Sequence, residues 1–154
     1  MRTIYQKSLP ILIPLILASC SHTLHGLEVV SPPVDYISPW LVEKVDSLHP
    51  TLAWKGTTSD VESYDLIVYS GVYILRSGVT PHYERGVKVY YREGIMGTSH
   101  QIEESLEPDT VYLWSVRTRM GSNLGDWSTY DFTRFMDPPV TMTNQWWRFR
   151  TPKK

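Results

Sequence analysis

The chain has 154 residues, with 15 basic and 16 acidic side chains, a formal net charge of −1, six tryptophans, ten tyrosines, eleven prolines and one cysteine. Its length suits one domain plus a short terminal segment, and its balanced charge excludes a polybasic nucleic-acid-binding protein. The many aromatic residues, with frequent proline and glycine, favour a compact β domain over a helical bundle or a disordered tail. A single cysteine leaves the domain without an internal disulfide, so a hydrophobic core must stabilise it.

The first residues carry the parts of an export signal. Arg2 and Lys7 supply positive charge, residues 9–17 form an apolar core interrupted by two prolines, and small residues follow. The core is shorter than the about 20 residues that a transmembrane helix needs. We therefore expect residues 1–19 to be a cleaved signal peptide that is not part of the folded domain.

The single cysteine follows this core directly. The run Leu17-Ala18-Ser19-Cys20 resembles the lipobox of bacterial lipoproteins. The resemblance implies cleavage before Cys20, a diacylglyceryl thioether on its sulfur and a fatty acyl chain such as palmitate on its amino group. Two or more acyl chains hold a protein stably on a membrane. Because Ser21 is uncharged, the resemblance also implies the outer membrane of the cell envelope; an ordinary export signal with a chance cysteine is the alternative.

The residues after Cys20 predict a tether and then a domain. We expect residues 20–27 to lift the domain from the lipid surface and residues 28–152 to fold. His22 and His25 lie three positions apart within the tether. Two histidines without fixed geometry are not a closed coordination set, so we expect solvated side chains, no metal site and no cofactor.

Short alternating segments between turn residues then recur at the spacing of an all-β sandwich. The pattern predicts seven or eight strands, over residues 27–30, 51–54, 64–69, 71–75, 87–92, 99–102, 111–120 and 145–150. In the longest segment, alternation places Tyr112, Trp114 and Val116 on one face and Arg117 and Arg119 on the other.

One turn carries a more specific pattern. Leu106, Pro108, Thr110 and Tyr112 occupy the positions of L-x-P-x-T-x-Y, which resembles the tyrosine corner of fibronectin type III domains. The resemblance implies an immunoglobulin-like sandwich in which the Tyr112 hydroxyl bonds to backbone a few residues upstream. Further matches, in the family's order, are Pro50-x-Leu52-x-Trp54, Tyr64-x-Leu66-x-Val68, Gly125-Asp126-Trp127-Ser128 and Phe149-Arg150-Thr151-Pro152, so the resemblance covers roughly residues 28–152.

Two departures from the family pattern leave details open. Ile102 lies four residues before Leu106, where three is commoner, so the register of that strand is not fixed. The segment from Phe132 to Asn144 adds length before the final strand. Either that strand begins near Ser128 and is broken by prolines, or a long loop precedes Trp146; we expect the loop, because paired prolines do not fit a central ladder.

The sequence carries no pattern of a catalytic site: there is no nucleophile elbow, P-loop or H-E-x-x-H motif. His49, His82 and His100 fall in separate loops or strand edges without a neighbouring nucleophile. Glu103 and Glu104 are adjacent, so on a strand they point to opposite faces. We expect exposed or edge histidines, solvated carboxylates and no enzymatic activity.

Aromatic residues beside arginines are the candidates for binding. We expect Arg117 or Arg119 to stack on Trp127 in a cation–π contact, either as a ligand platform or as packing at the sandwich edge. Trp146 and Trp147 are adjacent, so one should face inward and the other outward. The outward one, with Tyr130 and Tyr73, would form an aromatic binding patch or else pack into the structure.

These features predict a non-enzymatic binding or scaffold lipoprotein of the bacterial envelope. Its partners would be the membrane, through Cys20, and another envelope protein. The alternative is a carbohydrate-binding lipoprotein that uses exposed tryptophans and tyrosines. An aromatic row on one flat face would favour the sugar, and an aliphatic patch or exposed strand edge would favour the protein.

Overall fold

The structure is a computed structural model that describes residues 20–33, 42–56, 61–134 and 139–154. The predicted signal peptide, residues 1–19, lies outside the described residues. The described residues form strands and no helix, which confirms the expected all-β class. In chain order the strands are β1 (Cys20–His25), β2 (Val29–Ser31), β3 (Glu43–Lys44), β4 (Thr51–Trp54), β5 (Ser63–Ile74), β6 (His82–Ile95), β7 (Ser99–Gln101), β8 (Val111–Met120), β9 (Asn123–Leu124), β10 (Thr129–Arg134), β11 (Val140–Gln145) and β12 (Trp147–Arg150).

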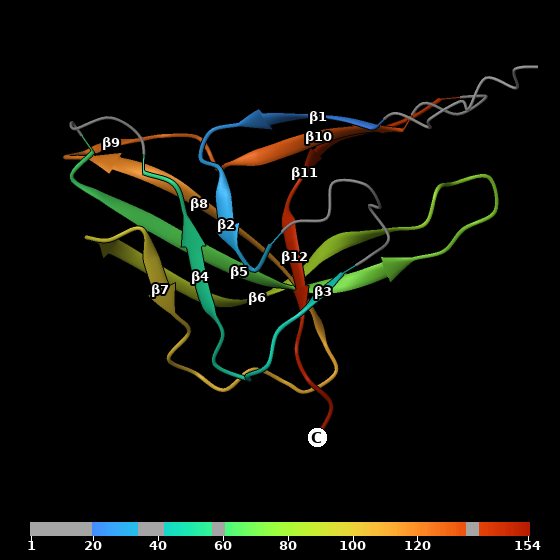
Figure 1. Ribbon diagram of the computed structural model, residues 1–154, viewed down its shortest axis with the longest axis horizontal. Coiled ribbons are helices and arrows are strands. Elements are labelled where there is room, and N and C mark those ends of the chain that lie inside the picture. The colour runs from blue at the N-terminus through green and yellow to red at the C-terminus, as the bar shows by residue number, and fades with distance from the viewer. Residues whose placement is uncertain (1–19, 34–41, 57–60, 135–138) are drawn as a thin grey trace, which may run out of the picture.

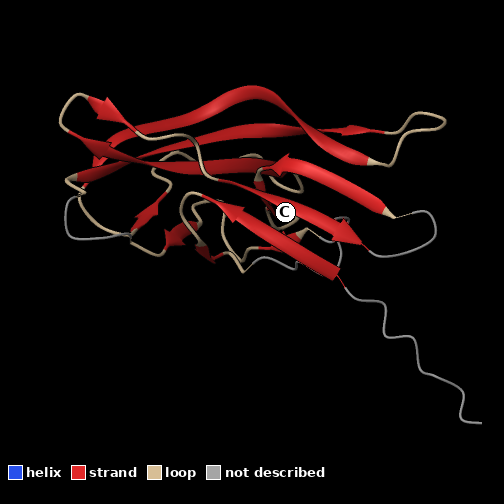
Figure 2. Ribbon diagram, turned by 90° about the horizontal axis from the view of Figure 1, so that it is seen from above, coloured by secondary structure: helices blue, strands red, loops and turns tan. Residues whose placement is uncertain are grey.

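These strands form three sheets (Figure 1). The largest has the order β3-β12-β8-β5-β6, with β9 beside β8, and a three-stranded sheet has the order β2-β4-β7. The third sheet, β1-β10-β11, adjoins them. Figure 2 shows long strands lying in one layer over shorter strands. The arrangement is sandwich-like, with side chains of facing sheets enclosed between the layers.

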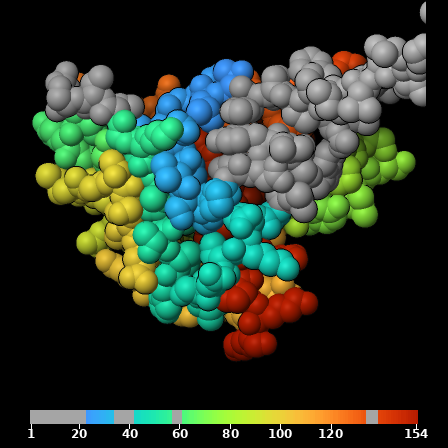
Figure 3. Space-filling model, in the orientation of Figure 1, coloured from blue at the N-terminus to red at the C-terminus, as the bar shows by residue number. Residues whose placement is uncertain are grey.

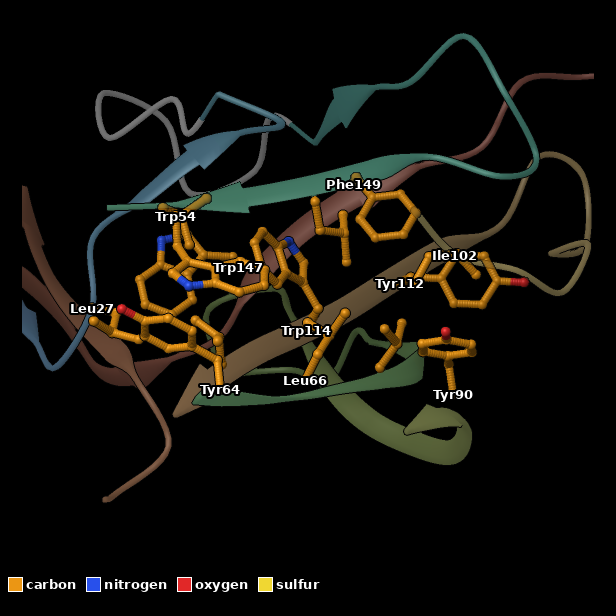
Figure 4. Packing of buried hydrophobic residues seen from close by; sticks show 14 of the residues in the cluster. Leu27, Trp54, Tyr64, Leu66, Tyr90, Ile102, Tyr112, Trp114, Trp147 and Phe149 are labelled. Atoms are coloured by element: carbon orange, nitrogen blue, oxygen red, sulfur yellow. The ribbon is translucent and has the colours of Figure 1, made fainter. Parts of the chain in front are cut away.

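The core lies between the largest sheet and β4. Leu52 and Trp54 on β4 face Leu66 on β5 and Trp114 on β8, and all four are at most 2% exposed. Figure 4 shows Trp147 of β12 within the same cluster. The inward positions are those that the alternation of β8 predicted, because successive side chains of a strand point to opposite faces.

Two strands have the predicted bounds, and two segments that were predicted as separate strands form one continuous strand. β4 and β8 match the predicted residues 51–54 and 111–120. The separate strand predicted over residues 71–75 is wrong, because β5 continues through Gly71 to Ile74. A Cβ at Gly71 would lie 2.9 Å from Leu113 Cδ1, so the glycine permits close packing on β8 and does not end the strand.

The pairing of β7 and the burial of Ile102 fix the register of the strand before Leu106, which the sequence left open. β7 pairs with β4 so that His100 lies opposite Leu52, and Ile102, just beyond β7, is fully buried. Leu106 is also buried, so both aliphatic residues face the core although four positions separate them.

The long loop expected between Phe132 and Asn144 is wrong, because β10 and β11 form an antiparallel pair there. The first strand begins at Thr129, close to the alternative start near Ser128. Pro139 directly precedes β11, where it interrupts no ladder hydrogen bond.

The free tether expected over residues 20–27 is also wrong. Residues 20–25 form β1, which pairs antiparallel with β10 from Cys20 opposite Arg134 to His25 opposite Thr129. Leu27 is 2% exposed, and its N–H donates to Ser128 Oγ at 2.7 Å. The N-terminal segment is therefore attached to the domain from Cys20 onward.

Candidate binding surface

The predicted cation–π contact is present. The Arg117 guanidinium carbon lies 4.4 Å from the ring centroid of Trp127, which confirms that one of the two arginines stacks on this indole. β8 turns Arg117 outward, and the backbone after β9 returns along β8, where the Ser128 N–H donates to the Val116 carbonyl at 3.0 Å. This return holds Trp127 over the outer face of the largest sheet.

We expect a double-mutant cycle to measure this contact. The effect of Trp127→Leu on the free energy of unfolding is compared in the wild-type protein and in the Arg117→Ala variant. The two effects should differ by about 0.5–1 kcal/mol, because a partly exposed cation–π pair has that magnitude. The matched cycle of Trp127→Leu with Arg119→Ala should be additive, since the Arg119 guanidinium is held by Asp65 and Glu93 and not by the indole. Equal coupling in both cycles would contradict the stacking.

A buried carboxylate, which the sequence did not single out, positions both arginines. Asp65 on β5 is fully buried. Its Oδ2 accepts a hydrogen bond from Arg117 Nε at 3.0 Å, and its Oδ1 accepts one from Arg119 Nε at 2.8 Å. The Gly94 N–H also donates to Oδ1, at 3.3 Å. Burial opposes ionisation of Asp65, but the hydrogen bonds from Arg119, Arg117 and Gly94 outweigh it and lower the pKa of this carboxyl.

The same network extends to the exposed surface. Arg119 Nη2 lies 3.3 Å from Glu93 Oε2, and the Tyr91 hydroxyl donates to Glu93 Oε1 at 2.7 Å. Arg117 Nη2 lies 3.4 Å from the Tyr91 hydroxyl. Arg119 is therefore held in an ion-pair network and does not stack on Trp127 as Arg117 does.

Aromatic rings form a row on this outer face. Tyr91, Trp127, Trp146 and Tyr69 follow one another with centroid separations of 6.4, 6.1 and 5.6 Å. The Arg85 guanidinium lies 4.7 Å from the Trp146 centroid, and the Lys88 ammonium lies 5.5 Å from the Tyr91 centroid. We call these four rings the aromatic row. A cation lies over each of them, because Arg85 also lies 5.9 Å from the Tyr69 centroid.

The predicted alternation of the paired tryptophans is confirmed. Trp147 is fully buried in the main core, and Trp146 packs in a second cluster with Ile67 and Leu113 on the outer face. Trp146 is only 8% exposed, so packing and not an open patch is its main role. The prediction that Tyr130 lies with Trp146 in an outward patch is wrong. Tyr130 is buried beside Trp147, with 6.0 Å between the ring centroids.

Tyr73 is half-exposed and contacts Tyr83 of β6, with 5.1 Å between the ring centroids. Tyr73 is therefore not one of the rings that follow one another in the aromatic row.

The predicted corner has the expected hydrogen bond. The Glu107 N–H donates to the Tyr112 hydroxyl at 2.9 Å, and burial raises the pKa of Tyr112. Thr110 Oγ1 donates to the Pro108 carbonyl at 2.9 Å, and Leu106 is buried beneath the turn. The residues of this pattern therefore fix a turn and contribute no exposed binding group.

We expect Tyr112→Phe to lower the free energy of unfolding by about 1–2 kcal/mol, because it leaves the Glu107 N–H without its acceptor. Urea unfolding measures the loss. Tyr83→Phe, at a half-buried tyrosine outside the corner, is the control and should change stability by less than about 0.5 kcal/mol. An unchanged midpoint in Tyr112→Phe would contradict a stabilising role for this bond.

The four histidine side chains that the structure describes have partners outside the aromatic row. His49 Nδ1 and His82 Nδ1 lie 3.3 and 2.8 Å from backbone carbonyls, and His100 Nε2 lies 2.6 Å from the Tyr90 hydroxyl. Burial lowers the pKa of His100. His25 Nε2 lies 3.0 Å from Asp131 Oδ2, so this predicted solvated histidine has a partner. Across the described ranges, no three His, Cys, Asp or Glu residues gather in a way that could hold a metal ion.

Glu103 and Glu104 are exposed, as expected for solvated carboxylates. Glu103 Oε2 lies 3.8 Å from Arg92 Nη1.

A hollow of about 660 Å³ borders the aromatic row. Its apolar lining includes Leu24, Leu27, Val61, Met120 and Trp127. Trp127 thus belongs both to the row and to this hollow, so the two features form one continuous surface.

No protein-family model, no curated protein and no solved structure matches the chain. Within the part of the chain that the structure describes, no helix is long and apolar enough to cross a membrane.

Proposed function

We propose that the chain is a lipid-anchored, non-enzymatic binding or scaffold protein of the bacterial cell envelope that contacts another envelope protein. The observation that carries the anchor is the run Leu17-Ala18-Ser19-Cys20 directly after an apolar export core. Acylation at Cys20 would hold the domain on the outer membrane. The histidine contacts described above, none of which includes a serine, threonine or cysteine nucleophile, support a role in binding over one in catalysis.

We propose further that the domain is fibronectin type III-like. Two features support this assignment: the sheet orders β2-β4-β7 and β12-β8-β5-β6, and the turn in which the Tyr112 hydroxyl accepts the Glu107 N–H. β1 and the β10–β11 pair would then be additions to that sandwich. The fold by itself assigns no activity, so the binding role rests on the surface.

The aromatic row supports a protein partner over a sugar. A pyranose ring stacks on an open aromatic face, but Arg117 lies over Trp127 and Arg85 lies over Trp146. The adjoining apolar hollow would accept a hydrophobic side chain, and Arg85 and Lys88 over the aromatic row would attract carboxylates. Carbohydrate binding remains the second candidate, because four rings do lie in sequence on one sheet face.

Mass spectrometry of the mature protein tests the anchor. We expect an N-terminal Cys20 peptide that carries a diacylglyceryl group and an additional acyl chain, and Cys20→Ser should move the protein to the soluble fraction. A protein that is released uncleaved or unmodified would contradict the anchor.

Site-specific photo-crosslinking in intact cells tests the binding surface. A crosslinking amino acid at Lys88, beside the aromatic row, should give one discrete adduct with an envelope protein. The matched control at Val30, which is half-exposed on β2, should give none. Binding of the purified domain to defined glycans, without a protein adduct from position 88, would favour the carbohydrate alternative.

A further inference from the structure

The β5–β6 turn carries exposed apolar side chains. Leu75 is 71% exposed and Val79 is 47% exposed. Between them, the Val79 N–H donates to the Arg76 carbonyl at 3.2 Å, and Gly78 has a φ of 77°, so the turn is tight and presents both side chains outward. We call residues 75–80 the β5–β6 tip.

This tip lies at the same end of the molecule as Cys20. Cys20 pairs with Arg134, and Arg134 pairs with Val140 across the β1-β10-β11 sheet. Val140 and Val79 in turn line one hollow of about 380 Å³. Figure 1 shows the start of β1 and the β5–β6 tip directed to the same side, and Figure 3 shows the yellow-green atoms of the tip projecting at that edge of the molecule.

Because β1 is paired with β10, no flexible linker separates Cys20 from the folded domain. Because Cys20 is already in register with Arg134, a lipid on Cys20 would bring this end of the domain to the bilayer surface. The β5–β6 tip would then meet the membrane interface, where burying apolar surface is favourable.

The charge of the tip suits an anionic lipid surface. The β5–β6 tip contains Arg76 and no acidic residue. Arg76 is exposed and makes no ion pair with any residue that the structure describes. Basic side chains beside an anchor add attraction to anionic lipids.

We propose that the β5–β6 tip is a second membrane contact, in which Leu75 and Val79 enter the interface and Arg76 meets anionic headgroups beside the lipid on Cys20. This proposal rests on the proposed acylation of Cys20. It fixes the orientation of the domain, with the Cys20 end on the bilayer and the opposite end of β6 facing away.

Fluorescence quenching in vesicles tests the contact. The acylated protein has no other thiol, so Val79→Cys gives one site for an environment-sensitive fluorophore. The protein is placed in vesicles of phosphatidylethanolamine and phosphatidylglycerol that contain a nitroxide lipid, without any other protein. The matched control is Met96→Cys, which is 82% exposed just beyond the other end of β6, on the order of 45 Å away along an extended strand.

We expect the label at position 79 to be quenched at least about twofold more than the label at position 96, with a blue-shifted emission. Leu75→Asp or Arg76→Glu should reduce that difference, and circular dichroism should show that these exposed substitutions leave the fold intact. Equal quenching at both positions in acylated, vesicle-bound protein would overturn the tip contact while leaving the anchor standing. Protein with unmodified Cys20 that stays in the aqueous phase would instead refute the proposed anchor.

Discussion

Asp65→Ala should be among the most destabilising single substitutions in this protein, lowering the free energy of unfolding by about 3 kcal/mol or more. It removes a fully buried carboxylate that Arg117 and Arg119 share, and leaves only the exposed Glu93 as an anionic partner of Arg119. Removing one partner of a buried ionic cluster is costly, because the remaining charges stay partly desolvated. Urea denaturation monitored by tryptophan fluorescence measures the loss.

Two variants separate the charge of Asp65 from its shape. Asp65→Asn keeps the volume and should still cost about 2 kcal/mol, because it no longer neutralises the arginines. Glu93→Gln removes an exposed partner of Arg119 and should cost less than about 1 kcal/mol. If Asp65→Asn were no more harmful than Glu93→Gln, the buried cluster would not contribute as we argue.

The same cluster gives the protein an acid-sensitive stability. The folded-state pKa of Asp65 lies below its ordinary value of 3.8, so the folded protein binds this proton less readily than the unfolded chain. The contribution of Asp65 is therefore fully present at neutral pH and is lost as the pH falls below the ordinary value and through the folded-state pKa. Asp65→Asn should show a shallower loss of stability over that range than wild type.

Trp147→Ala should have a comparable effect, about 3–5 kcal/mol, since removing a buried tryptophan combines lost burial with a cavity. The indole is fully buried, with Trp114 and Tyr130 at centroid separations of 6.1 and 6.0 Å. Thermal or urea unfolding measures the change in stability.

The adjacent tryptophan is the natural comparison. Trp146→Ala removes a ring on the outer face, where Tyr69 and Arg85 can move toward the space, and should cost about half as much. Trp147→Phe should cost roughly 1 kcal/mol, because it keeps an aromatic ring and removes a buried indole N–H that has no hydrogen-bond partner among the described residues. Equal losses for both alanine variants would contradict the difference between the two faces.

Local patterns were enough to predict part of this architecture. β4 and β8 have the predicted bounds because core side chains recur at every second position along them, Leu52 and Trp54 on β4 and Tyr112, Trp114 and Val116 on β8. The Tyr112 hydrogen bond spans five residues, so all of its determinants lie in one short run of sequence. The outward direction of Arg117 and Arg119 on β8 predicted that one of them stacks on Trp127, and the structure shows that it is Arg117.

The missed features depend on contacts between distant segments. Asp65 lies among apolar residues of β5, and nothing near it in the sequence indicates that β8 supplies two arginines across the strand pair. The β10–β11 pair was missed because its prolines suggested a loop, although Pro139 stands outside the ladder. β1 has a short polar sequence, and its strand conformation depends on β10, which lies near the other end of the chain.

The pairing of β1 with β10 also constrains the order of biogenesis. β1 is synthesised well before its partner strand β10, so this pairing forms only after β10 has been made. Enzymes that cut and modify a chain need an accessible, extended segment, which Cys20 no longer offers once it is paired with Arg134. In an acylated protein, modification would therefore precede closure, and release of this strand would be needed for any later removal of the lipidated end.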